Sequence, residues 1–142
     1  MLTQTIKQIL LRDLDKLRTE ITAYKKEEHI WVTVPEINNP AGNLVLHLVG
    51  NLNTYIGATL GNTDYVRQRE LEFSLKDVSR EALLEKIDGT RKMISTVMDS
   101  LDDSILPKTY PLIVFEKEMT TEFFLVHLCG HLNYHLGQIN YH

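Results

Sequence analysis

Residues 127–142 read His127-Leu-Cys-Gly-His131-Leu-Asn-Tyr-His135-Leu-Gly-Gln138-Ile-Asn-Tyr-His142. On an α-helix a step of four residues returns to within about 40° of its starting direction. His127, His131 and His135 therefore form one stripe along one face of a predicted helix. A neutral imidazole is the commonest metal ligand in proteins, so the stripe indicates a metal or proton-transfer site. Because a helix presents this face in one direction only, a tight site needs a further ligand from another element.

The composition is that of an ordinary globular protein, with 142 residues, 43% hydrophobic and 24% charged. This length favours one domain over residues 1–142 with its own core. The net charge of −4 and the absence of any basic run longer than Lys25-Lys26 argue against nucleic-acid binding. The apolar runs are too short to cross a bilayer, and the first residues lack the pattern of a secretory signal. With Cys129 as the single cysteine, we expect a cytoplasmic protein without membrane contact.

Apolar residues recur at helical spacing in four long segments. We expect helices over about residues 2–26, 40–60, 79–100 and from about 120 onward. Pro40 is a start signal for the second helix, Gly61-Asn62 a stop signal, and Ser79 a start signal for the third. Four such helices predict an all-α four-helix bundle, with a long crossover between the second and third helices.

The connecting segments are predicted to be irregular. Ile30–Val34 is expected to be an extended connection, because Pro35 closes it, and residues 64–77 are expected to be a loop that crosses the fold. Leu112–Phe115 is either a short strand or a packed loop. The aromatic side chains expected mainly in the core are Trp31, Phe115, Phe123 and Phe124. The histidines expected to be exposed are His29 and His142.

The predicted second helix offers the missing ligand. The residues beside His47 on its face are small or polar, namely Asn43, Asn51, Thr54 and Ala58, and Gly50 lies on the flank of this face. This stripe leaves room for His47 to meet His131 and His135 across the bundle interior. Three protein ligands with one open position are typical of catalytic zinc, whose bound water has a lowered pKa. Gln138, one turn beyond His135, is a candidate to orient a ligand or the water.

The residues around the histidine stripe bear on other kinds of site. Cys129 faces away from His131, so a site of cysteine and histidine ligands is not expected. Leu132 stands where a zinc metalloprotease carries its glutamate, which argues against a protease. Glu70 and Glu72 offer a general base near the metal, although solvated loop carboxylates are the favoured interpretation. The alternative interpretation is that the histidines are structural, each hydrogen-bonded to a neighbour. The pattern assigns no catalytic residue.

Two runs of sequence resemble the DinB-like superfamily, a group that includes small uncharacterised bacterial proteins. They are Asn43-Leu-Val-Leu-His47-Leu-Val-Gly-Asn51-Leu and the run from His127 to Ile139, and Arg67–Phe73 is similar to the family's segment after the second helix. The resemblance implies a four-helix bundle with an up-down-down-up path. It also implies a divalent metal, often zinc or nickel, held by His47, His131 and His135. His127 matches a position that is frequently histidine without being counted as a ligand, and Leu136 stands where members commonly have arginine.

The resemblance further implies a homodimer and, from some relatives, a transferase or isomerase that uses a small-molecule thiol. The leading hypothesis is a metal-dependent enzyme, transferase or hydrolase-like, with one open coordination position. The alternative is a non-catalytic dimeric bundle whose histidines are structural or bind metal only for stability. The residues expected to support the ligands or line the pocket are Asn43, Asn51, His127 and Gln138.

Overall fold

The computed structural model describes residues 1–33, 35–36 and 38–141, and this part of the chain is mainly helical without any strand. The all-α class expected from the sequence is therefore confirmed. The long helices are α1 (Leu2–Ala23), α2 (Ala41–Leu52), α5 (Arg80–Asp99) and α6 (Thr121–Tyr141). The α2 helix continues through a π-helical turn, η2 (Asn53–Ala58), into α3 (Thr59–Gly61). The shorter elements are η1 (Glu27–Trp31), α4 (Arg69–Ser74) and η3 (Asp103–Ile105).

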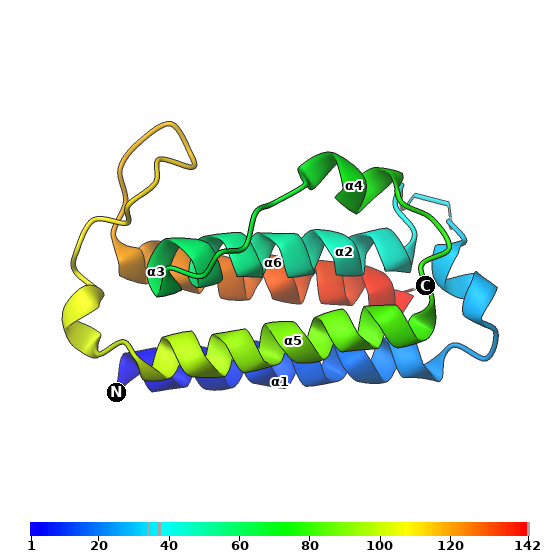
Figure 1. Cartoon of the computed structure of the whole chain (residues 1–142), viewed down its shortest axis with the longest axis horizontal. Helices are drawn as coiled ribbons and strands as arrows, with labels where there is room; N and C mark the ends of the chain where they lie inside the picture. The colour runs from blue at the N-terminus through cyan, green and yellow to red at the C-terminus, as the bar shows by residue number, and fades with distance from the viewer. Residues whose placement is uncertain (34, 37, 142) are drawn as a thin grey trace.

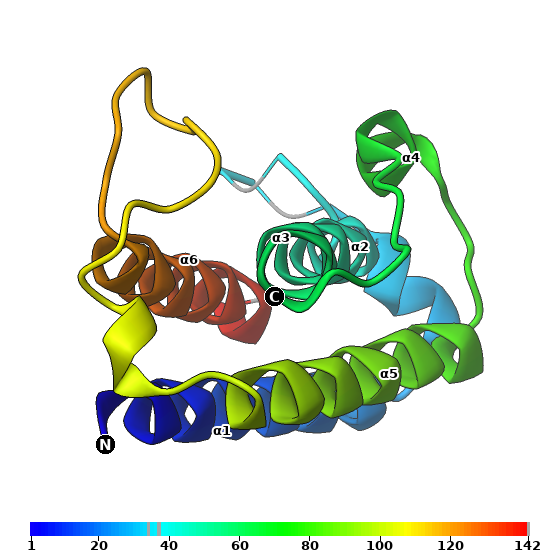
Figure 2. The same cartoon turned by 60° about the vertical axis from the view of Figure 1, so that its left-hand side comes forward.

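The long helices form two layers, with α2 and α6 lying over α1 and α5 (Figure 1). In that view α1 and α6 run from left to right, whereas α2 and α5 run from right to left. The chain between α3 and α5 therefore returns along the length of the molecule, as the long crossover predicted from the sequence requires. Its short helix α4 packs on the side of α2 that faces away from α1 (Figure 2).

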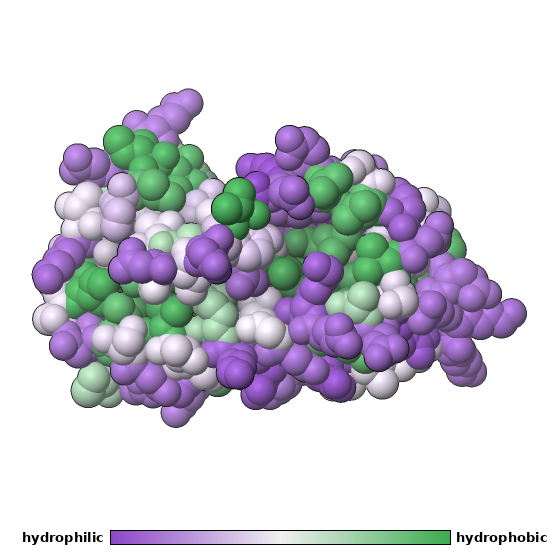
Figure 3. All heavy atoms as spheres, viewed as in Figure 1, coloured by the Kyte–Doolittle hydropathy of each residue, from purple (hydrophilic) through white to green (hydrophobic). Residues whose placement is uncertain are grey.

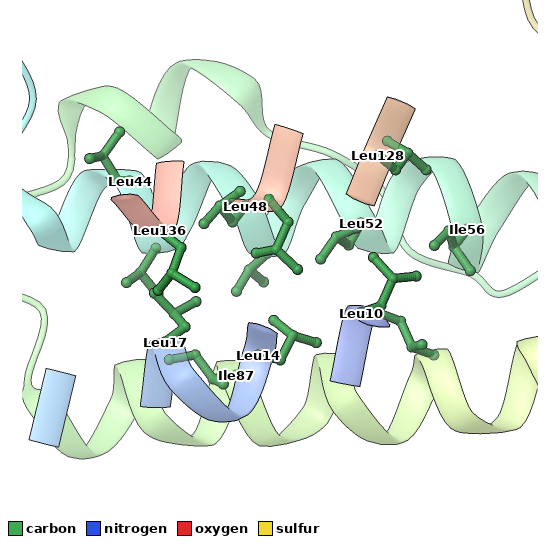
Figure 4. Packing of buried hydrophobic residues seen from close by; sticks show 14 of the residues in the cluster. Leu10, Leu14, Leu17, Leu44, Leu48, Leu52, Ile56, Ile87, Leu128 and Leu136 are labelled. Carbon is green, nitrogen blue, oxygen red and sulfur yellow. The ribbon is translucent and has the colours of Figure 1, made fainter. Parts of the chain in front are cut away.

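Leucine and isoleucine side chains from the long helices fill the space between the two layers (Figure 4). Leu14 of α1, Leu48 of α2 and Ile87 of α5 are all completely buried. Burying one such side chain stabilises the fold by about 1.5–3 kcal/mol. The apolar residues at helical spacing thus form the core that holds α2 and α6 in place. These are the two helices that carry the candidate ligands.

The sequence signals at the helix ends mostly act as predicted. Ser79 precedes α5, and its side-chain oxygen accepts a hydrogen bond from the backbone N–H of Ala82. Asn62 follows α3 with a φ of 54°, the left-handed conformation that ends many helices. Pro40 lies just before α2, which begins at Ala41, one residue later than predicted.

Two predictions for the connecting segments need correction, and the structure decides between the two alternatives for a third. Residues 27–31 form the 3₁₀-helix η1, so the expected extended connection begins only at Val32, and Val34 lies outside the described residues. The predicted loop over residues 64–77 contains α4, which the contacts described below hold in place. Leu112–Phe115 forms no strand, and near it only an isolated bridge pairs Thr109 with Thr120.

The prediction that the aromatic residues lie in the core is correct for only some of them. Phe124 is 1% exposed and Trp31 is half-buried against the core. Phe115 and Phe123 are 45% and 60% exposed, so the core prediction is wrong for both. Phe115 belongs to the loop before α6, which projects from the helices and carries an apolar surface (Figure 3).

Two further predictions were that His29 and His142 are exposed and that no segment crosses a membrane. His29 is exposed as expected, and His142 lies outside the described residues. None of the described helices combines the length and the hydrophobicity that crossing a bilayer requires.

Candidate metal centre

The structure brings together the three histidines that helical spacing selected. His47 comes from α2, and His131 and His135 come from successive turns of α6. One ring nitrogen from each lies within 4.8 Å of the others, and the Nε2 atoms of His47 and His131 are 3.2 Å apart. Zinc–nitrogen bonds of about 2.0–2.1 Å place two ligands of a tetrahedral ion about 3.3 Å apart, and the Nε2 atoms of His47 and His131 match this spacing. Cys129 is not in this group.

His47 is held in place by a buried carboxylate from the crossover segment. Its Nδ1–H donates to Oε1 of Glu72 over 3.1 Å. Glu72 is only 5% exposed, and its two oxygens also accept hydrogen bonds of 2.8 Å and 3.0 Å from the Arg67 guanidinium. A carboxylate that accepts from the outer ring nitrogen fixes the tautomer of a metal-binding histidine. The Nε2 lone pair of His47 therefore points into the centre.

Two residues of α2, Asn43 and Gly50, allow Glu72 to lie beside His47. The side-chain amide of Asn43 donates to the backbone carbonyls of Glu72 and Leu75, over 2.9 Å and 2.8 Å, and so ties α4 to α2. A Cβ atom on Gly50 would lie 1.9 Å from Oε2 of Glu72, so only glycine lets the carboxylate come this close to the helix. The small residues beside His47 were expected to leave space there, and Glu72 fills part of it.

The two ligand candidates on α6 are supported differently from each other. The Nδ1–H of His135 donates to Oε1 of Gln138 over 2.6 Å, which leaves its Nε2 free for a metal. The Nδ1 atom of His131 is buried and has no hydrogen-bond partner among the described residues. His131 is therefore the least constrained of the three.

Burial keeps two of these rings in the uncharged form that binds metals. Burial lowers the pKa of His47, and the hydrogen bond to Glu72 offsets this effect only in part. Burial, together with the nearby His135 and His47, lowers the pKa of His131 to about 4. Both rings are consequently neutral at neutral pH, and their nitrogen lone pairs are available.

A pocket of about 180 Å³ adjoins His47 and His131. The His127 ring lines it, 4.7 Å from the ring of Phe115 and 6.3 Å from the ring of His131. His127 lies outside the group of three converging nitrogens. Asn51 also lines this pocket and is 7% exposed, with its Oδ1 atom buried and unpartnered within the described part of the chain.

The family model for the DinB superfamily matches residues 9–139. The chain belongs to the DinB superfamily. The match includes all three converging histidines, and so confirms the resemblance that rested on the runs around His47 and His131. In this DinB protein Leu136 is 7% exposed and packs in the core, so the position gives no cation to the site. No curated protein matches the chain.

Glu72 is the functional residue that sequence reasoning misplaced. Both crossover glutamates were expected to be solvated or to face the metal, and only Glu70 is exposed. Glu72 instead binds the far side of His47. The available signals were Arg67, five residues earlier in the chain, and Gly50, one helical turn after His47 on α2, but neither shows from spacing alone that the two segments meet.

Proposed function

We propose that this DinB protein binds one divalent metal ion through His47, His131 and His135 and acts as a metal-dependent enzyme. The observation that carries the proposal is the set of hydrogen bonds behind the rings. Glu72 and Gln138 accept from the Nδ1–H groups of His47 and His135, so both Nε2 lone pairs face one point. Such outer partners are a regular feature of metal-binding histidines.

The chemistry follows from having three protein ligands and an adjoining pocket. A bound divalent ion would lower the pKa of a coordinated water or thiol. Zinc and nickel both accept imidazole ligands and are the metals we propose. We propose a thiol-dependent transfer or a hydrolase-like reaction of a small molecule in a reducing, cytoplasmic setting. His127 and Asn51 would contact this substrate from the pocket wall, while Glu72 and Gln138 hold the ligands.

We also propose that the fold is a four-helix bundle with an up-down-down-up path, in which α2, η2 and α3 count as one helix. The course of the chain in Figure 1 supports this interpretation. Facing helices of a bundle commonly carry metal ligands that project inward. Here α2 and α6 would supply the ligands, and α1 and α5 would supply the hydrophobic support beneath them.

Metal analysis of protein purified without an affinity tag tests the binding. We expect about one equivalent of zinc or nickel after loading, and loss of most of it in His131→Ala and His135→Ala. His29→Ala is the matched control, because His29 is exposed and remote in the chain from the ligands. His127→Ala should also keep its metal. Less than about a tenth of an equivalent, with no uptake on titration, would exclude a metal centre.

Catalysis is tested separately from binding. The metal-loaded protein is incubated with several small thiols and electrophiles, and thiol consumption is measured beside metal-free protein. Turnover that requires the metal and disappears in His131→Ala supports an enzyme. Bound metal that raises the melting temperature without turnover in any pair would favour the non-catalytic bundle instead.

We propose a homodimer formed through the outer face of α6. Phe123, Val126 and Tyr134 are 60%, 53% and 65% exposed at helical spacing. Gly130 lies between them with open space where a side chain would stand, so a second helix can approach closely. Light scattering should give twice the monomer mass, and Val126→Glu should give the monomer. A monomeric wild-type protein at high concentration would contradict this assignment.

A further inference from the structure

The pocket beside the candidate metal centre is positively charged, although the whole chain carries a net charge of −4. Its charged lining residues are Arg67 and Arg69. The charge of Arg67 is balanced by its paired hydrogen bonds to Glu72. Arg69 is exposed and forms no ion pair with any described residue. The guanidinium of Arg69 is therefore the unbalanced charge at this pocket.

The opposite wall of the pocket is aromatic. Phe124 is 1% exposed and lies edge-on to Tyr55, with 5.1 Å between ring centroids. Phe115 packs 4.7 Å from His127, so the projecting loop completes this wall. The hollow between that loop and α4 is visible in Figure 3, where the loop side is mainly hydrophobic and the α4 side carries both hydrophilic and hydrophobic residues. A ligand here would place an apolar body toward the loop and a charge toward α4.

A buried polar group gives an independent sign of a ligand. Asn51 lines the pocket and is 93% buried, yet its Oδ1 atom has no partner among the residues described. Leaving such a group unpaired costs about 1–3 kcal/mol. Because an amide oxygen only accepts hydrogen bonds, a ligand with a donor group would remove this cost, and rotation of the amide would instead turn its Nδ2–H groups toward an anion. The volume of about 180 Å³ is below the range of drug-sized pockets, so the ligand is small.

We infer that this pocket binds a small organic anion with a flat apolar body, whose anionic group pairs with Arg69 and whose body lies against Phe115 and Phe124. The inference rests on the proposed function, because it names the substrate class for the same centre. Arginine forms strong, directional hydrogen bonds with carboxylates, which makes a carboxylate the simplest anion to test. Arg69 would supply the charge from the start of α4, where it lines the same pocket as His47 and His131.

The test compares three probes. Phenylacetate has both an aromatic ring and a negative charge, phenylacetamide has the ring without the charge, and acetate has the charge without the ring. Each is titrated into metal-free protein and into zinc-loaded protein, with binding followed by calorimetry or by NMR. Metal-free wild-type protein should bind phenylacetate about tenfold more tightly than phenylacetamide, and more tightly than acetate by several fold. Arg69→Gln should reduce the preference for phenylacetate over the amide to less than about threefold. Arg18→Gln is the matched control, because Arg18 is exposed and pairs with Asp88 between α1 and α5.

The outcomes separate this inference from the metal proposal. Equal binding of phenylacetate and phenylacetamide to wild-type protein would overturn it, and so would an unchanged preference in Arg69→Gln. Acetate binding as tightly as phenylacetate would overturn the aromatic part. The metal-free titration does not depend on the ion, so a protein that takes up no zinc can still show the Arg69-dependent preference. Zinc uptake without the Arg69-dependent preference for phenylacetate would support the metal centre and contradict the anion pocket.

Discussion

Gly50→Ala tests whether the crossover carboxylate is locked against the candidate metal centre. The new Cβ atom would stand 1.9 Å from Oε2 and 2.7 Å from Cδ of Glu72. Glu72 must then move, and movement weakens its bonds to Arg67 and His47. We expect the free energy of unfolding to fall and metal binding to weaken in the same variant.

The magnitude follows from two opposing effects. Alanine favours a helix interior over glycine by about 1 kcal/mol. A hydrogen bond to a charged group contributes about 1.5–3 kcal/mol, and at least one such bond is lost or stretched. For one lost bond, the net loss of stability in metal-free protein is therefore about 0.5–2 kcal/mol. Disturbing the partner of a metal-binding histidine typically lowers metal affinity by about 10–100-fold.

The assay is urea unfolding of the metal-free protein, followed by a zinc titration against a competing chelator. Gly89→Ala is the matched control, because Gly89 lies in α5 with no atom within 4 Å of a new Cβ. The control should be as stable as wild type or more stable, with unchanged zinc affinity. If Gly50→Ala behaves like Gly89→Ala in both measurements, Glu72 does not hold His47 and the reasoning is refuted.

Three further predictions concern the fold and its response to pH. The stability of metal-free protein should fall as the pH drops from about 6.5 toward 4, because the unfolded chain protonates its histidines near pH 6.5 whereas the folded-state pKa of His131 is about 4. Unfolding measured at a series of pH values should show a shallower fall in stability for His131→Gln. Leu14→Ala removes a completely buried side chain and should cost about 2–5 kcal/mol in urea unfolding. Ser79→Ala removes the acceptor for the N–H of Ala82 and should cost about 1 kcal/mol, against little change for the exposed Thr96→Ala.

The long helices and the converging histidines were predictable because both depend on local, periodic patterns. Apolar residues at helical spacing marked α5 and α6, and Ser79 marked the start of α5. The same periodicity placed His131 and His135 on one face of α6 and made His47 the candidate across from them. The faces follow from the geometry of each helix alone, and the small residues beside His47 indicated that the two faces meet. The structure places the three side chains together.

The crossover segment was not predictable in this way. The α4 helix has six residues, too few to show a reliable period and too few for a stable isolated helix. It is held by contacts distant in sequence: Asn43 binds its backbone, and Glu72 packs over Gly50. Phe115 was misplaced for a related reason, because an apolar residue in a loop carries no periodic signal of which surface it covers.

The ligand candidates thus differ in which part of the fold sets their orientation. His135 depends on Gln138, one turn away on the same helix, so α6 alone positions it. His47 depends on Glu72, Arg67 and the attachment of α4 by Asn43, so the crossover between α3 and α5 positions it. That same segment carries Arg69 to the edge of the pocket. A displacement of α4 would therefore change the orientation of His47 and the position of the pocket's unbalanced charge together, while leaving His135 in place.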